Sequence, residues 1–100
     1  MKKRESEKNL ERELVRRAGR LGCLALKFAS GTETGYPDRL VLTPGGRAEW
    51  VELKSEGERP TLLQRIRHER LRRMGFRVEV VHTRAELLRY LDGLEEGLGL

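Results

Sequence analysis

The sequence predicts an α/β protein in which helices flank one mixed β-sheet. Segments with apolar residues at helical spacing alternate with short segments in which apolar and β-branched residues gather. Glycine or proline stands at most of the junctions between them, where chains turn. The predicted order is α-β-β-β-α-β-α, and helices in that order can cover a sheet. With 100 residues, the chain fits a single domain, residues 1–100, with a core over about residues 6–92.

The first predicted helix covers residues 6–21 and ends near Gly22, as helices often do. Glu7 and Glu11 fall inside its apolar arc, whereas Glu13 falls outside. Because buried carboxylates need a partner, we expect Glu7 or Glu11 to meet a cation or a metal. The alternative is that Glu7 favours the helix dipole and Glu11 pairs with a basic side chain. The apolar arc consists of Leu10, Leu14, Val15, Ala18 and Leu21.

The next three elements are predicted as strands. Apolar residues alternate along residues 23–28, and a polar, glycine-rich loop covers residues 29–37. Residues 39–42 and 48–53 are two short apolar runs separated by a Pro-Gly-Gly turn. Such a turn is typical of a hairpin, so we expect these two strands to be antiparallel neighbours. The alternating residues of the first strand are Leu24, Leu26 and Phe28.

The second half of the chain predicts two helices around one strand. A polar connector over residues 55–60 leads into a helix over residues 61–74, and a glycine closes that helix. Residues 76–81 are rich in β-branched side chains and predict a strand. A capping box opens the last helix, and we expect residues 95–100 to be frayed. The residues of the capping box are Thr83 and Glu86.

Composition and charge narrow the class of protein. The 21 Lys and Arg residues outnumber the 16 Asp and Glu residues, and the net charge of +5 suggests a polyanionic partner. Apolar residues make up 37% of the chain, so the core is either thin or completed by a partner subunit. The single cysteine, Cys23, predicts no internal disulfide, and the P-loop, CxxC and HExxH motifs are absent from the sequence. Without a membrane-length apolar run or a signal peptide, we expect a cytoplasmic protein with no membrane contact.

Two acidic residues and a lysine form the candidate catalytic group. Side chains alternate along the third predicted strand, so Glu52 and Lys54 face the same side. The hairpin would bring Asp38 near Glu52, and two facing carboxylates without His or Cys favour Mg²⁺ or Mn²⁺. Lys54 would then orient or deprotonate a water, or stabilise the charge on a phosphate. The alternatives are a solvated strand face and, for Asp38, a turn-capping aspartate.

The second predicted helix combines a polar side with a dense basic surface. Gln64, His68 and Leu71 share one side, although Gln64 also has capping-box spacing with Thr61. We expect His68 to pack or to contact a phosphate rather than to act as a general base. The helix also carries five arginines, which predict contact with a phosphate backbone or, alternatively, form a solvated surface. The arginines are Arg65, Arg67, Arg70, Arg72 and Arg73.

The candidate catalytic group belongs to a longer pattern. Pro37-Asp38 followed by Glu52-Leu53-Lys54 is the PD-(D/E)xK nuclease signature. Over about residues 7–91, the sequence resembles the viral-type replication-repair nuclease family, VRR-NUC, in its stand-alone phage or bacterial type. The matching pieces are Glu7 and Glu11, Lys27-Phe28, Gly35-Tyr36-Pro37-Asp38-Arg39, the Pro-Gly-Gly turn, Val51-Glu52-Leu53-Lys54, Gln64 and Gly75-Phe76-Arg77-Val78.

The resemblance implies a restriction-endonuclease-like PD-(D/E)xK core and a metal-dependent endodeoxyribonuclease. Family members that consist of this domain alone resemble Holliday-junction resolvases, which cut branched DNA as homodimers with Mg²⁺ or Mn²⁺. The implied partners are branched or duplex DNA and a second copy of the chain, without a small-molecule substrate. The implied location is a bacterial or phage-infected cell. The alternatives are a flap or single-strand nuclease of a phage replication, repair or restriction system, and an inactive DNA-binding module.

The resemblance also implies roles for the site residues. Asp38 and Glu52 would hold the metal together with the backbone carbonyl of Leu53, and Lys54 would position the attacking water. Gln64 would line the site from the second helix. The first-helix carboxylate stays open, because the family's spacing favours the first of two glutamates, whereas archaeal junction resolvases with a similar Glu-Arg-Glu-Leu run favour the second. These two glutamates are Glu7 and Glu11.

DNA contacts are expected at the basic N-terminal tail, in the second helix and at positions within the matching motifs. Such contacts would hold the phosphate backbone without reading the base sequence, so affinity should fall steeply as salt rises. The residues predicted to contact DNA are Lys2, Lys3, Arg4, Lys27, Ser30, Arg39, Arg65, His68 and Arg72.

Overall fold

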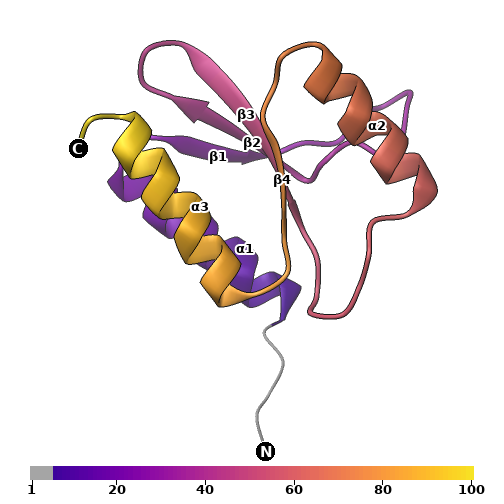
Figure 1. Cartoon of the computed structure of the whole chain (residues 1–100), viewed down its shortest axis with the longest axis horizontal. Helices are drawn as coiled ribbons and strands as arrows, with labels where there is room; N and C mark the ends of the chain where they lie inside the picture. Colours follow the sequence, from indigo (N-terminus) through magenta and orange to yellow (C-terminus); the bar gives the residue numbers. More distant parts are fainter. Residues whose placement is uncertain (1–5) are drawn as a thin grey trace, which may run out of the picture.

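The computed structural model describes residues 6–100, so the predicted DNA contacts of Lys2, Lys3 and Arg4 lie outside the described residues. The described chain follows the predicted order α-β-β-β-α-β-α, which confirms the α/β fold class (Figure 1). Its elements are α1 (Glu7–Arg20), β1 (Leu24–Lys27), β2 (Arg39–Thr43), β3 (Arg47–Leu53), α2 (Leu62–Arg73), β4 (Val78–Val81) and α3 (Arg84–Gly97).

The four strands form one mixed sheet in the order β1-β2-β3-β4. The predicted hairpin is confirmed, because β2 and β3 pair antiparallel and Thr43 lies opposite Arg47 on either side of the turn. β1 extends this sheet as an antiparallel neighbour of β2. β4 pairs parallel to β3, since the chain crosses over through α2 before it returns to the sheet.

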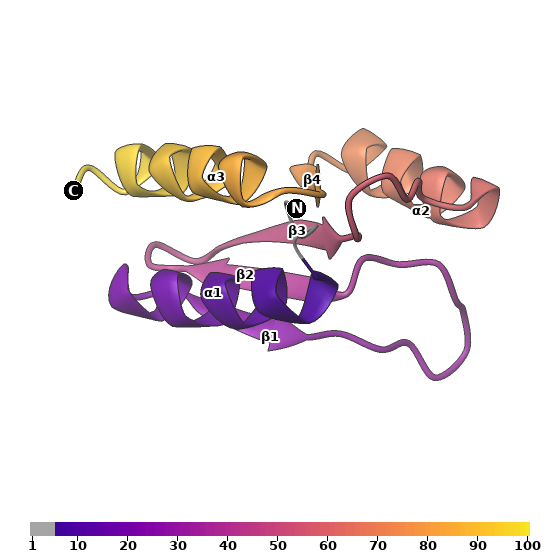
Figure 2. The same cartoon turned by 90° about the horizontal axis from the view of Figure 1, so that it is seen from below.

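Helices cover both faces of the sheet. Figure 1 shows α1 and α3 together on one side, while α2 lies on the other, and the turned view in Figure 2 shows the same separation. Residues of α1 and α3 contact each other, and each of these helices also contacts strands. The sheet therefore separates an α1/α3 face from an α2 face.

The larger core lies on the α1/α3 face. Leu10, Leu14 and Ala18 of α1 are fully buried there, and α3 continues to Gly97, where Leu98 packs against the same core. The expectation that residues 95–100 are frayed is therefore wrong, because packing extends the last helix. The sheet supplies Ala25, Val41, Val51, Leu53 and Val81 to this core, and α3 supplies Leu87, Tyr90, Leu91 and Leu94.

A smaller core lies under α2 and is mainly aromatic. Trp50 packs edge-on against Phe28, with ring centroids 4.8 Å apart, and Leu71 of α2 joins them. Aromatic rings contribute large buried areas, so a few of them can anchor a helix. The other members of this cluster are Val78, Tyr36, Leu40 and Phe76.

Three apolar residues behave differently from the expectation. Val15 is 41% exposed, because the buried side of α1 is narrower than the predicted arc and Val15 stands at its edge. Cys23, just before β1, and Ala25 within it face the core, while Leu24 and Leu26 of β1 are 58% and 44% exposed. The alternation along this strand was correctly predicted, but the large side chains lie on the α2 face, which α2 covers only in part.

In the described part of the chain, no helix combines the length and the apolar character needed to cross a membrane.

Candidate active site

The hairpin register brings Asp38 and Glu52 together. Arg39 pairs with Val51, so the residues one step further, Asp38 and Glu52, face each other on the α2 side of the sheet. The backbone carbonyl of Asp38 also accepts a hydrogen bond of 2.8 Å from the N–H of Phe28, which ties this end of β2 to β1. The predicted proximity of the two carboxylates is present in the structure.

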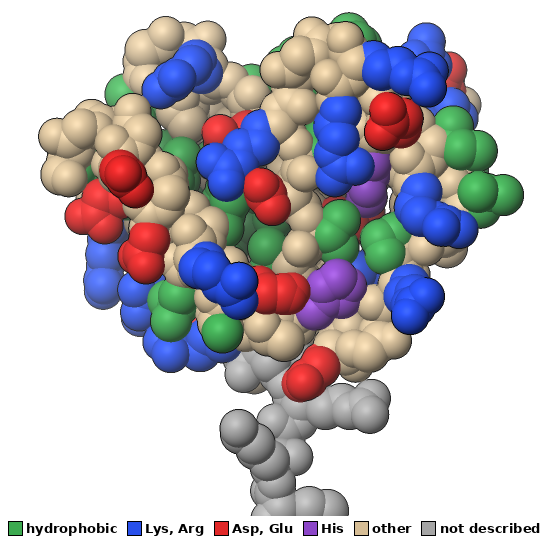
Figure 3. All heavy atoms as spheres, viewed as in Figure 1, with side chains coloured by type: hydrophobic (Ala, Val, Ile, Leu, Met, Phe, Trp, Pro, Cys, Tyr) green, Lys and Arg blue, Asp and Glu red, His purple; other side chains and the backbone are tan. Residues whose placement is uncertain are grey.

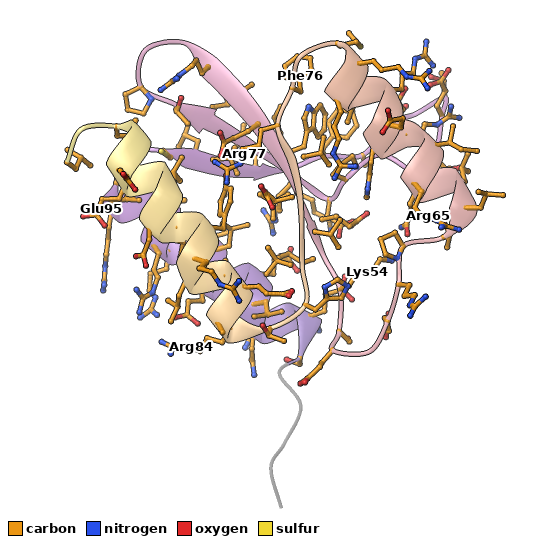
Figure 4. All side chains as sticks on the ribbon, viewed as in Figure 1. Lys54, Arg65, Phe76, Arg77, Arg84 and Glu95 are labelled. Atoms are coloured by element: carbon orange, nitrogen blue, oxygen red, sulfur yellow. The ribbon has the colours of Figure 1, made fainter. Side chains whose placement is uncertain are left out.

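Lys54 stands directly after β3, on the same face as Glu52. Its backbone N–H donates to the carbonyl of Val81 at 3.0 Å, which continues the parallel pairing one residue beyond β3. Figure 4 shows Lys54 at this end of β3, with Arg65 on the first turns of α2 above it in this view.

Burial and the neighbouring carboxylate control the protonation of Asp38. Burial, a hydrogen bond with Glu52 and the charge of Glu52 raise the pKa of Asp38 from 3.8 to about 7, against the opposing effects of Lys54 and the Leu53 backbone. Without a cation, the Asp38 carboxyl therefore keeps its proton up to about pH 7, because an adjacent carboxylate disfavours its ionisation. A bound divalent cation would remove that constraint.

Glu52 is buried together with His68. Each residue is 1% exposed, and the Glu52 Oε1 atom lies 3.7 Å from the His68 Nε2 atom. Burial, with smaller effects from Arg72 and Lys54, lowers the pKa of His68, while Asp38 opposes the change. Of the two expectations for His68, packing or a phosphate contact, this burial agrees with packing.

The two first-helix glutamates have different surroundings. The pKa of Glu7 is raised, first by burial and then by the charge of Asp38, while Lys54 opposes the rise. Glu7 is therefore within electrostatic reach of Asp38 and Lys54. Glu11 instead forms a close ion pair with Arg39, which corresponds to the alternative in which Glu11 has a basic partner.

Arg39 has a structural role in this arrangement. Its guanidinium also donates to the carbonyl of Ala25 at 3.1 Å, and its side chain is only 13% exposed. The expectation that Arg39 contacts DNA is corrected, because the guanidinium is committed to joining α1, β1 and β2.

Gln64 caps α2. Its side chain accepts a hydrogen bond of 2.8 Å from the N–H of Thr61, and its own N–H donates to the Thr61 hydroxyl at 3.1 Å. This is the reciprocal capping box that stood as the alternative to a site role. In this structure the amide oxygen of Gln64 is used by the helix rather than by the candidate site.

The other residues predicted to contact DNA differ in whether their side chains already have partners in the structure. Lys27 and Arg65 are exposed, and no partner of either is described. Arg72 donates to the carbonyl of Val78 at 2.9 Å. The Ser30 hydroxyl accepts from the N–H groups of Thr32 and Glu33. Figure 3 shows Lys and Arg side chains gathered over α2, with hydrophobic side chains beside them at the margin.

Sequence reasoning missed how tightly the loop before Asp38 is held against α2. Arg67 donates to the carbonyl of Thr34 at 3.0 Å and stacks over the Tyr36 ring. Gly35 has a φ of +93° and lies so close to α2 that a Cβ would be 3.0 Å from the Leu63 side chain. The glycine was visible in the sequence, but nothing local indicated which helix it approaches.

The donor set suits a hard cation with few protein ligands. Within residues 6–100, no three His, Cys, Asp or Glu side chains lie close enough to hold a metal ion together. Mg²⁺ usually keeps several waters and binds through one or two carboxylates and the substrate phosphates, so Asp38 and Glu52 suffice as its core. The close approach of the Asp38 and Glu52 carboxylates, which raises the pKa of Asp38, is an arrangement that a divalent cation relieves.

Comparison with known proteins finds nucleases among the similar chains. The chain is 40% identical over 77 residues to "Putative nuclease p44" of Acyrthosiphon pisum secondary endosymbiont phage 1, which covers 77% of this chain and 83% of that relative. A solved structure described as a VRR_NUC domain has a TM-score of 0.81 and 31% identity, over 86% of this chain and 94% of that one. No family model matches the chain.

The fold, together with an Asp-Glu-Lys group at the open end of the β2–β3 hairpin, away from its turn, defines a nuclease of the PD-(D/E)xK class. Within that class, the chain belongs to the VRR-NUC family. The resemblance noted in the sequence is thereby confirmed.

Proposed function

We propose that this nuclease is a Mg²⁺- or Mn²⁺-dependent, structure-specific DNA endonuclease that resolves four-way junctions as a homodimer. The observation that carries the proposal is the convergence of Asp38, Glu52 and Lys54 on the α2 face at one end of the sheet. Two adjacent carboxylates with an ammonium beside them form a site that suits a cation and a phosphate together.

Asp38 and Glu52 would hold the cation together with the Leu53 backbone carbonyl, and Glu7 would act on the site through its charge rather than as a third carboxylate ligand. When bound, such a cation polarises the scissile phosphate and lowers the pKa of a water that attacks it. The Asp38 carboxyl would lose its proton as the cation binds, because the charge of the cation replaces that of the proton. Of the two first-helix glutamates, Glu7 takes the site role, since Glu11 is already paired with Arg39.

Lys54 would orient the attacking water and stabilise the negative charge that develops on the phosphate. Its ammonium is a point charge on a flexible stem, so it can follow the phosphate during the displacement. The charge of Lys54 acts on both Asp38 and Glu7, because it opposes the rise in the pKa of each carboxyl. That coupling supports a position within the same small group of atoms.

The DNA backbone would lie over α2 and the neighbouring loop. Arg65 is exposed on α2, and a shallow groove on the same helix is lined by several more arginines. Contacts to phosphates supply affinity without base readout, which suits recognition of a branched shape rather than a sequence. The groove residues are Leu62, Arg65, Ile66, Arg67, Glu69, Arg70 and Arg73.

Exposed apolar side chains support the homodimer. Leu24 and Leu26 lie on the part of the α2 face that α2 leaves uncovered, and Leu62 and Ile66 are 66% and 51% exposed on α2 itself. Exposed apolar side chains of this kind favour association. Two-fold symmetry would present two identical sites, as two symmetric cuts across a junction require.

Cleavage of defined DNA substrates tests the proposed activity. Four-way junction, flap, linear duplex and single-stranded DNA are incubated with Mg²⁺ or Mn²⁺ and with wild type, Glu52→Gln or Lys54→Ala. We expect the wild type to cut the junction best and to stop when EDTA removes the cation, and each variant to lose about 10²-fold or more. Equal cutting by all three proteins would refute the site, and preferential cutting of flaps or single strands would refute the junction specificity.

A further inference from the structure

Glu52 and His68 are the two buried charged or polar side chains of the described core. Their facing atoms, Glu52 Oε1 and His68 Nε2, lie 3.7 Å apart, and neither has a hydrogen-bond partner. Buried polar atoms are normally paired, because an unpaired one loses its bonds to water without replacement. A shift of about half an ångström would bring these two atoms within ordinary hydrogen-bond distance.

His68 approaches Glu52 from the opposite layer of the molecule. It lies in the middle of α2, and His68 and Leu71 are the buried residues of that helix. An apolar side chain in place of His68 could pack over the aromatic cluster without the cost of burying an unpaired nitrogen. An imidazole aimed at the buried carboxylate of the candidate site therefore indicates a role in that site rather than in packing alone.

The two oxygens of Glu52 have different neighbours. The Glu52 carboxylate lies beside Asp38 at the site, while its Oε1 atom faces His68 at 3.7 Å and has no hydrogen-bond partner. A carboxylate held at one oxygen keeps the other oxygen in a fixed direction, which is how groups behind a metal ligand tune its affinity. The geometry thus separates one oxygen for the site from one oxygen for His68.

We propose that His68 is a positioning residue, whose Nε2–H donates to Glu52 Oε1 and holds the Glu52 carboxylate toward Asp38 and the cation. The proposal rests on the proposed metal-dependent function and adds a residue to it. His68 would not touch the DNA or the cation, because Glu52 lies between it and the site.

Binding of Mn²⁺ to the DNA-free protein, measured by isothermal titration calorimetry, tests this role without relying on cleavage. His68→Leu removes the donor at similar volume, and His68→Gln keeps an N–H group near the place of Nε2. We expect His68→Leu to weaken Mn²⁺ binding about 10–100-fold, and His68→Gln to recover most of that loss.

Leu71→Ala is the matched control, because Leu71 is buried on the same helix but does not face Glu52. This substitution should lower the melting temperature and leave Mn²⁺ affinity within about twofold of wild type, since it loosens α2 by creating a cavity. If Leu71→Ala weakens Mn²⁺ binding as much as His68→Leu does, packing of α2 explains the effect and the positioning role is refuted.

A measurement on the wild type tests the proposal even if the His68→Leu protein does not fold. The ¹⁵N spectrum of the His68 ring distinguishes its tautomers, and we expect the proton on Nε2. A proton on Nδ1 alone would overturn the proposal, because Nε2 could not then donate. Unchanged Mn²⁺ affinity in a folded His68→Leu would also overturn it. By contrast, a wild type that neither binds Mn²⁺ nor cuts DNA with it would refute the proposed function itself.

Discussion

At the scale of single residues, the carboxyl of Asp38 carries the most chemical information. Burial and Glu52 raise its pKa to about 7, so the folded protein holds a proton there that the unfolded chain releases near pH 3.8. The hairpin creates this difference, because it brings the two acidic side chains together from positions well separated in the sequence. The same proton is what a cation would displace.

Asp38→Asn should become more stable relative to wild type as pH rises from about 4 to about 7, in EDTA. A raised pKa contributes stability that is fully present below the unfolded pKa of 3.8 and is lost as pH rises through about 7. Asparagine does not titrate and therefore loses nothing. Urea unfolding of both proteins at several pH values measures the difference, and a difference that does not change with pH would contradict the raised pKa of Asp38.

Glu7→Gln and Glu11→Gln should separate a site role from a structural role. Glu7→Gln removes a carboxylate beside Asp38, so cleavage should fall while the free energy of unfolding stays within about 1 kcal/mol of wild type. Glu11→Gln leaves Arg39 without its ionic partner and should cost about 1–3 kcal/mol while cleavage is retained. Cleavage and urea unfolding are measured on both variants, and the reverse pattern would assign the site role to Glu11.

At the scale of elements, caps and turns were predictable, whereas the widths of buried faces were not. Ser6 and Thr61 cap α1 and α2 through their hydroxyls, as short-range patterns indicate. Glu13, which was placed outside the apolar arc, is nearly buried because Arg84 of α3 binds it at 2.9 Å. A helical wheel describes one helix and cannot include the second helix that covers its edge.

Gly35→Ala should destabilise the protein more than Gly46→Ala. Both glycines have positive φ, so both substitutions carry backbone strain, but only at Gly35 would the new Cβ meet side chains of α2, at 3.0 and 3.1 Å. We expect an additional cost of about 1 kcal/mol or more at Gly35. Urea unfolding compares the two variants, and equal losses would mean that the loop moves away from α2 without cost.

At the scale of the whole molecule, a sheet with one face only partly covered explains the low apolar content. The α1/α3 face encloses the larger core, whereas the α2 face leaves Leu24 and Leu26 in contact with solvent. A second subunit placed there would complete the core of a chain whose apolar fraction is 37%. A dimer formed through this surface would account for both the low apolar fraction and the exposed leucines of β1.

Leu24→Glu combined with Leu26→Glu should convert a dimer into a monomer at micromolar concentration. Charged side chains on both faces of a contact resist burial, so association is lost while the fold is retained. Val15→Glu is the control, because Val15 is also exposed but lies on α1, on the other side of the sheet. Sedimentation velocity measures the mass, and a monomeric wild type or a dimeric double variant would refute this interface.

By itself, the sequence determined the α/β class, the order of the elements, the hairpin and the Asp38, Glu52 and Lys54 group. These depend on local signals: turn residues, capping patterns, side-chain alternation and a short motif. Tertiary structure decided the burial and the partners of individual side chains, which local signals do not encode. It buried His68 against Glu52, committed Arg39 to Glu11, used Gln64 as a cap and exposed the leucines of β1. The physical reason is that burial and pairing depend on which neighbour covers a residue, and neighbours from distant segments meet only when the sheet and helices pack.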